Sequence, residues 1–126
     1  MTQLADEWFR QAEYDLDVAR LMHAGARHSY AVFMCHLAVE KALKGLYQTR
    51  KGTVPPKTHN LIYLLKVLDA APDEETKQFL ATLTQAYVAT RYPDNLETLQ
   101  ERYTEAVAQQ MIARTEEALA WIRTLQ

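Results

Sequence analysis

Basic and titratable side chains occur at three places in the chain, and their types suit phosphate chemistry. Lys41 and Lys44 lie close together in one segment. His59 follows a pair of prolines, and Arg91 with Tyr92 comes just before another proline. Arginine binds phosphate through two parallel hydrogen bonds, lysine acts as a point charge, and histidine exchanges protons near neutral pH. The set predicts a phosphate-binding site with Arg91 and His59 as the catalytic candidates.

Each of these residues also has an ordinary structural role. Lys44 lies four residues after Glu40, so the two side chains can form an ion pair within one helix. His59 can hydrogen-bond within its own loop, and Arg91 can neutralise the carbonyl end of its helix. Both interpretations stay open, because the sequence does not show whether Lys44, His59 and Arg91 meet.

Other kinds of site lack their motifs. No glutamate precedes a histidine by three residues, as a di-iron bundle requires, and the four histidines show no tight metal-binding spacing. Neither GxGxxG nor the phosphate-loop lysine motif occurs. Cys35 lies in an apolar run, where a thiol is a poor nucleophile, so we interpret it as a reduced core cysteine. We expect no metal and no cofactor.

Helices must position these residues, because the chain has only three glycines and four prolines and so few places to turn. Apolar residues recur at helical spacing in five segments, at residues 4–24, 29–50, 59–70, 72–91 and 94–125. The expected fold is all-α, a single domain over residues 1–126. It is an up-and-down bundle of four long helices with one short helix between the second and the fourth.

Polar residues at the segment ends predict where the helices begin. Thr58 is the expected cap of the short helix. Asp94 is the expected cap of the last one, where Glu97 completes a pattern similar to a capping box. Pro93 closes the helix before it. The segment 91–98 is therefore predicted to be a joint between two helices.

Composition and charge limit the function classes. Apolar residues make up 48% of the chain, no signal peptide is visible and no apolar run is long enough to cross a membrane, so we expect a cytoplasmic protein. The net charge of −2 does not favour bulk nucleic-acid binding. Residues 18–68 nevertheless contain eight bases and one acid, a net of +7 against −9 elsewhere. This asymmetry marks an anion-binding face, or charges that offset one another locally.

Four motifs follow one another along the chain: Trp8-x3-Ala12-x2-Asp15-Leu16-x2-Ala19, Tyr30-Ala31-x4-His36-Leu37-Ala38-Val39-Glu40-Lys41-Ala42-Leu43-Lys44, Pro55-Pro56-x-Thr58-His59-Asn60-Leu61-x2-Leu64 and Arg91-Tyr92-Pro93-Asp94. In this order and with these gaps, the chain resembles the HEPN domain family over nearly its whole length. The resemblance implies a compact helical bundle that is often dimeric. It also implies a partner, a small nucleotidyltransferase, frequently in a toxin–antitoxin pair.

Several branches of that family are metal-independent ribonucleases, and the resemblance implies their motif. An arginine is followed by a histidine after four to six residues, and the ribose 2′-OH attacks the adjacent phosphate. Arg91 matches the arginine, but the eligible positions hold Leu96, Glu97 and Thr98. His59 takes the place of the missing histidine only if the fold brings it near Arg91.

Three functions follow from these observations. The first is a nucleotide- or phosphate-binding module that pairs with a nucleotidyltransferase and uses Lys44, Lys41, His59, Arg91 and Tyr92. The second is a ribonuclease with an atypical site, formed by Arg91 and His59. The third is a purely structural interaction domain, in which some of the seven tyrosines and two tryptophans form a homodimer surface.

Overall fold

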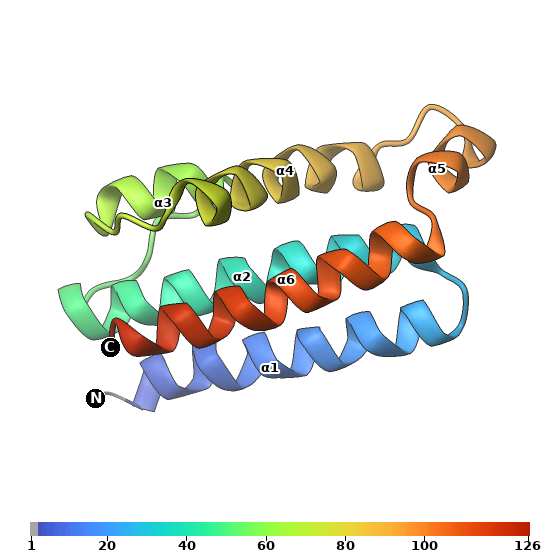
Figure 1. Ribbon diagram of the computed structural model, residues 1–126. Coiled ribbons are helices and arrows are strands. Elements are labelled where there is room, and N and C mark those ends of the chain that lie inside the picture. The colour runs from blue at the N-terminus through green and yellow to red at the C-terminus, as the bar shows by residue number, and fades with distance from the viewer. Residues whose placement is uncertain (1–2) are drawn as a thin grey trace.

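The computed structural model describes residues 3–126, which form six α-helices and no strand (Figure 1). The helices are α1 Gln3–Ala24, α2 His28–Lys51, α3 Leu61–Val67, α4 Glu74–Arg91, α5 Leu96–Arg102 and α6 Glu105–Thr124. Four of them are long and two are short. The predicted all-α bundle is confirmed.

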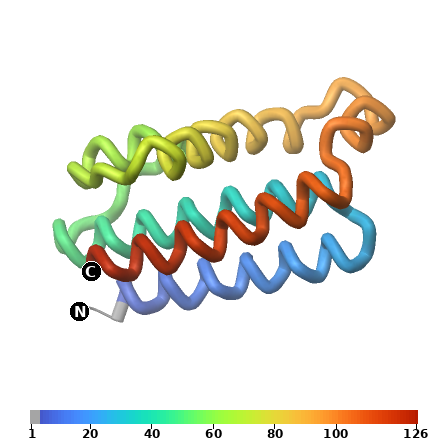
Figure 2. Tube along the Cα trace, in the orientation of Figure 1, coloured from blue at the N-terminus to red at the C-terminus, as the bar shows by residue number. Residues whose placement is uncertain are grey.

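Helix α2 is the centre of the bundle. It contacts each of the other five helices, with α1 on one side of the α2–α6 pair and α3 and α4 on the other (Figures 1 and 2). Its sequence explains this position, because the segment from Tyr30 to Val39 is apolar on nearly all sides. A helix with that pattern is stable only when other elements cover it all round. Val32, Cys35, Val39 and Leu43 are accordingly fully buried.

Helices α1 and α2 approach closely at Gly45. A Cβ atom at this position would lie 2.9 Å from the ring of Phe9 and 3.1 Å from Trp8. Only a glycine therefore allows α1 to pack at this distance. In α1, Ala12 and Leu16 are buried, and near its start Phe9 is buried while Trp8 is only half-buried.

The last predicted helix is interrupted, which corrects the expectation of one continuous helix over 94–125. Helix α5 ends at Arg102, and α6 begins at Glu105 after a break at Tyr103 and Thr104. The Thr104 side chain accepts a hydrogen bond from the Val107 N–H at 3.3 Å and so caps α6. The apolar spacing continues through the break, which is why periodicity did not reveal it.

Two predicted helix caps are displaced along the chain. Asn95, not Asp94, caps α5 by accepting from the Thr98 N–H at 2.8 Å. Asn60, not Thr58, caps α3 by accepting from the Tyr63 N–H at 3.1 Å. Thr58 instead accepts from the Asn60 N–H at 3.1 Å and shapes the turn before the helix. In both cases an asparagine lies closer to the first helical residue than the residue that was predicted.

One side chain joins the ends of three helices. The Arg50 guanidinium, in the last turn of α2, donates to the carbonyl of Leu68 at 3.0 Å and to that of Leu125 at 3.2 Å. These carbonyls are C-cap groups of α3 and α6. A cation is favourable there, because the carbonyl end of a helix has partial negative charge.

Candidate functional site

A polar stripe crosses the apolar centre of α2. His36, Glu40 and Lys44 follow one another at intervals of four residues, so they share one face of the helix. Their exposed fractions are only 0%, 6% and 8%. Lys44 Nζ donates to Glu40 Oε2 at 3.0 Å, which confirms the ion pair that the spacing suggested. Buried charges require such partners, because isolated ones are costly to remove from water.

His59, in the loop between α2 and α3, joins His36, Glu40 and Lys44 in one polar cluster. Its Nδ1 lies 2.7 Å from Glu40 Oε1, so one carboxylate contacts both Lys44 and His59. The backbone of the same residue is held as well, since its carbonyl lies 2.7 Å from His36 Nε2. A carbonyl can only accept, so His36 Nε2 is the donor and carries the proton. Both the side chain and the main chain of His59 are therefore bonded to α2.

His36 is neutral at physiological pH. Burial lowers its pKa from 6.5 to about 4, while the hydrogen bond to the His59 carbonyl and the Glu40 charge act in the opposite direction. With the proton on Nε2, its Nδ1 has no hydrogen-bond partner and lies 3.8 Å from Glu40 Oε1. His36 therefore holds the loop rather than supplying charge.

Tyr87 of α4 links this cluster to Arg91. Its ring centroid lies 4.4 Å from that of His36 and 4.7 Å from that of His59. The Arg91 guanidinium donates to the Tyr87 hydroxyl, and its central carbon lies 5.6 Å from the Tyr87 ring and 5.4 Å from the Tyr92 ring. The Tyr87 ring is thus in contact with both His59 and Arg91, although these two residues lie far apart in the sequence.

The predicted site residues separate into three positions. His59, Arg91 and Tyr92 are exposed beside Tyr87, with 53% of the His59 side chain accessible. Lys44 is buried, with its ammonium against Glu40. Lys41 faces α1 instead, where its Nζ lies 2.9 Å from Asp15 Oδ2, so the structure does not bring it to this cluster.

Tyr87 is the residue that sequence reasoning missed. It lies within the predicted helix 72–91 and is buried, with 7% of its surface exposed. The available signal was its spacing: Tyr87 precedes Arg91 by four residues, which places both on one helix face. Nothing in the sequence showed that His59 would reach the same ring.

The basic segment 18–68 is partly neutralised by the fold. Arg20 lies 2.7 Å from Asp17 and 3.5 Å from Glu116, and Lys41 pairs with Asp15. Acids from outside the segment thus offset some of its charge. This agrees with the interpretation of local compensation for these residues.

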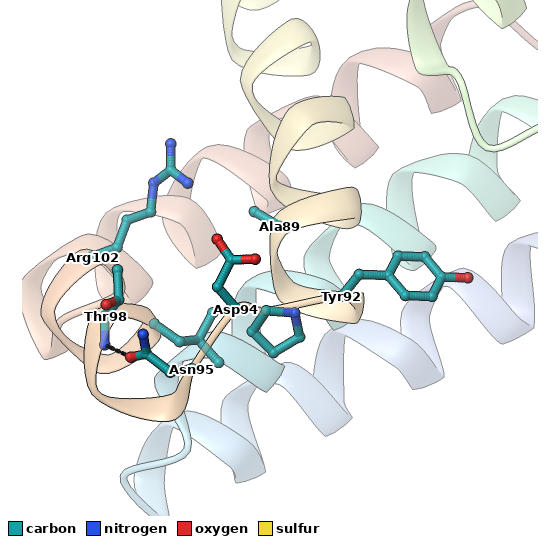
Figure 3. Close-up of a pocket in the computed structure, with 8 residues that line it drawn as sticks. Ala89, Tyr92, Asp94, Asn95, Thr98 and Arg102 are labelled. Carbon is teal, nitrogen blue, oxygen red and sulfur yellow. Dashed lines mark hydrogen bonds between the residues drawn. The ribbon is translucent and has the colours of Figure 1, made fainter.

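A hollow lies at the joint between α4 and α5, and of the predicted site residues only Tyr92 lines it (Figure 3). It is lined by Ala89, Tyr92, Pro93, Asp94, Asn95, Thr98, Leu99 and Arg102. Figure 3 shows the Tyr92 ring pointing away from Asp94 and Arg102, and it marks the cap from Asn95 to Thr98. Neither His59 nor Arg91 lines the hollow. Both of these residues contact Tyr87 instead.

Two other features of the described chain bear on its chemistry. Cys35 is buried, and burial raises the pKa of its thiol to about 11, so the thiolate nucleophile is disfavoured. Within residues 3–126 no three histidine, cysteine or acidic side chains are grouped so that they could hold a metal ion. Over the same residues, no helix has the length and apolarity needed to cross a membrane.

A family model for the HEPN domain matches residues 5–125, which is nearly the whole chain. The chain belongs to the HEPN domain family. This HEPN chain is similar to TT1696 from Thermus thermophilus, with a TM-score of 0.87 and 27% identity over 99% of this chain and 100% of that one. It is also similar to ST0689, an archaeal HEPN homologue, with a TM-score of 0.79 and 30% identity over the same shares. The comparison with curated proteins gave no match.

The predicted resemblance is therefore confirmed. In this HEPN chain, the positions separated from Arg91 by four to six intervening residues form the first turn of α5. They hold Leu96, Glu97 and Thr98, and the Thr98 N–H is used by the cap. The imidazole that shares the Tyr87 ring with Arg91 is that of His59, from the α2–α3 loop.

Proposed function

We propose that this HEPN chain binds the phosphate group of a nucleotide or of RNA on the surface formed by His59, Arg91 and Tyr92. The observation that supports the proposal is the shared contact with Tyr87, which has His59 against its ring and Arg91 on its hydroxyl. The centroid of the Tyr87 ring lies 4.7 Å from the centroid of the His59 ring and 5.6 Å from the guanidinium carbon of Arg91. These two distances limit how far apart the imidazole and the guanidinium can be. A single sugar-phosphate unit is long enough to contact both.

Arg91 has the properties of a phosphate ligand. It is exposed, and it takes part in none of the ion pairs found within residues 3–126. Its bond to the Tyr87 hydroxyl orients the guanidinium without neutralising it. A guanidinium has five N–H donors, so several remain for an anion. Tyr92, which is 68% exposed beside it, offers a ring for a base to stack on.

The two lysines have different places in this proposal. Lys44 is buried and does not bind the ligand; its charge holds Glu40, and Glu40 in turn holds His59. Lys41 is bound to Asp15 and lies outside the proposed surface.

Calorimetric titration tests the proposal. We expect binding of inorganic phosphate and nucleoside monophosphates to weaken about tenfold or more in Arg91→Gln, because charged hydrogen bonds contribute about 1.5–3 kcal/mol. Arg27→Gln is the matched control, since Arg27 is also exposed and forms no ion pair in the described chain. Equal binding by both variants, or no heat with any of these ligands, would overturn the proposal.

We further propose that the chain pairs with a small nucleotidyltransferase, in the manner of a toxin–antitoxin pair, and that it is a homodimer. Family membership is what supports these partners. Sedimentation of the pure protein measures the oligomeric state. Co-expression with the product of a neighbouring nucleotidyltransferase reading frame tests the pair, and separate elution of the two proteins would contradict it.

A second candidate is a metal-independent ribonuclease, which the hydrogen bond between Glu40 and His59 favours. A carboxylate behind an imidazole orients it for proton transfer. In this case His59 would accept the proton of the ribose 2′-OH while Arg91 holds the phosphate. RNA cleavage in the presence of a chelator, lost in His59→Asn and kept in His28→Asn, would support it. Intact RNA after prolonged incubation would exclude it.

A further inference from the structure

We propose that Glu40 is a positioning residue that selects the tautomer of His59, so that the neutral ring carries its proton on Nδ1. The other ring nitrogen, Nε2, is then a hydrogen-bond acceptor at the surface. The choice of ligand for this acceptor rests on the proposed function. The position of the proton on the neutral ring does not, because it follows from the contacts of Glu40 within the chain.

The contacts of Glu40 determine which nitrogen carries the proton. An ionised carboxylate only accepts hydrogen bonds, so the 2.7 Å contact of Glu40 Oε1 requires a proton on His59 Nδ1. The second oxygen accepts from Lys44 Nζ at 3.0 Å, and this ammonium stabilises the carboxylate charge. With only 6% of its surface exposed, Glu40 has little water to replace these partners.

The surroundings of His59 keep the ring in this orientation. Its face lies against Tyr87, with an angle of 25° between the ring planes. The carbonyl of the same residue accepts from His36 Nε2, so the main chain cannot turn away without breaking a buried bond. His59 Nε2 has no bond to any residue in 3–126, and more than half of the side chain is exposed. The free nitrogen therefore faces solvent.

The exposed groups on either side of Tyr87 thus differ in polarity. His59 Nε2 accepts a hydrogen bond, whereas the Arg91 guanidinium donates several and is positively charged. A ligand that satisfies both presents a hydroxyl to His59 and an anionic oxygen to Arg91. Sugar phosphates have this combination.

Nitrogen-15 NMR of the histidine rings tests the inference without any ligand. Long-range proton–nitrogen correlation, at a pH where His59 is neutral, should show a protonated Nδ1 and an unprotonated Nε2. In Glu40→Gln the amide oxygen should turn to Lys44 and the amide N–H₂ to His59 Nδ1. The proton should then move to Nε2. Asp15→Asn is the matched control, because Asp15 is also buried and paired with a lysine of α2 but does not contact His59.

A protonated Nε2 in the unmodified protein would overturn the inference. This measurement does not depend on how well the variants fold. An unchanged His59 tautomer in folded Glu40→Gln would show that Glu40 does not position the ring.

The ligand is tested by comparing a ribonucleoside 3′-monophosphate with its 2′-deoxy counterpart, which lacks the hydroxyl beside the phosphate. We expect the ribose form to bind about fivefold tighter, as for one neutral hydrogen bond, and the preference to vanish in His59→Ala. Equal binding by the unmodified protein would show that His59 does not select a hydroxyl. If neither ligand binds, the proposed function fails, while the NMR result still decides the role of Glu40.

Discussion

The buried cluster on α2 and the joint between α4 and α5 contribute to the same surface in different ways. In the cluster, Glu40 bonds to both Lys44 and His59, so each position depends on the others. At the joint, Arg91 and Tyr92 are exposed, and only local contacts orient them. The comparison shows that packing holds one half of the site, while the other half is accessible to ligand. Tyr87 is the contact between the two halves.

The largest expected effect comes from breaking the cluster. Glu40→Ala leaves the buried Lys44 ammonium and the His59 N–H without their acceptor, so the free energy of unfolding should fall by about 3–5 kcal/mol. Urea denaturation measures the loss. In the double variant Glu40→Met with Lys44→Met, apolar side chains replace the pair, and we expect most of the stability to return. A loss below about 1 kcal/mol in Glu40→Ala would show that the cluster is not held by this carboxylate.

The next effect depends on pH. Because the pKa of His36 is about 4 in the folded state and 6.5 when unfolded, the unfolded chain binds the proton first as pH falls. The stability contributed by neutral His36 is present above pH 6.5 and is lost as pH falls toward 4. Between pH 7 and pH 5 this loss is about 2 kcal/mol.

The variant His36→Gln isolates this contribution. Its amide can still donate to the His59 carbonyl but does not titrate in this range. Urea denaturation at both pH values should show a smaller loss for the variant than for the unmodified chain. The same loss in both proteins would contradict the assignment of a neutral, buried His36.

The helix caps give a smaller effect and distinguish two adjacent residues of the joint. Asn95→Ala removes the acceptor for the Thr98 N–H and should cost about 1 kcal/mol. Asp94→Ala should change the free energy of unfolding by less than about 0.5 kcal/mol, since Asp94 does not cap α5. Thermal unfolding of the two variants compares them directly. A larger loss of stability in Asp94→Ala than in Asn95→Ala would show that Asp94 caps α5, as the sequence predicted.

The smallest effect on stability is expected at Arg91. Arg91→Gln should alter the free energy of unfolding by less than about 0.5 kcal/mol, because the side chain is exposed and forms no ion pair in the described part of the chain. A loss of several kcal/mol would show that Arg91 stabilises the fold, as the residues of the buried cluster do. Weak phosphate binding in that variant would then follow from partial unfolding.

The sequence predicted the helices well where apolar periodicity and a turn residue coincide. The predicted segment 4–24 ends with α1, just before Gly25, and the segment 72–91 ends with α4 but begins two residues before it, at Pro72. The break before α6 was missed because Thr104 is neither glycine nor proline, and its capping role depends on local geometry. Periodicity reports which face is buried and does not report a change in helix direction.

The candidate site was predicted only in part. His36, Glu40 and Lys44 form a stripe that spacing alone reveals. The meeting of His59 with Glu40 is a contact across 19 residues, and it depends on the path of the loop after α2. No local pattern encodes that path. Lys41 was grouped with Lys44 because a spacing of three residues places two side chains on neighbouring parts of a helix surface. In the structure their partners differ, since Lys41 pairs with Asp15 and Lys44 with Glu40.

The Arg50 side chain has a consequence for local opening of the bundle. It bonds to carbonyls that lie 18 and 75 residues further along the chain, at the ends of α3 and α6. When the end of one of these helices frays, Arg50 loses one of its two acceptor carbonyls. Its guanidinium is then held less firmly, so its bond to the end of the other helix is weakened. Fraying at the two ends should therefore be cooperative. In hydrogen exchange, the last amides of α3 and α6 should lose protection together in Arg50→Gln.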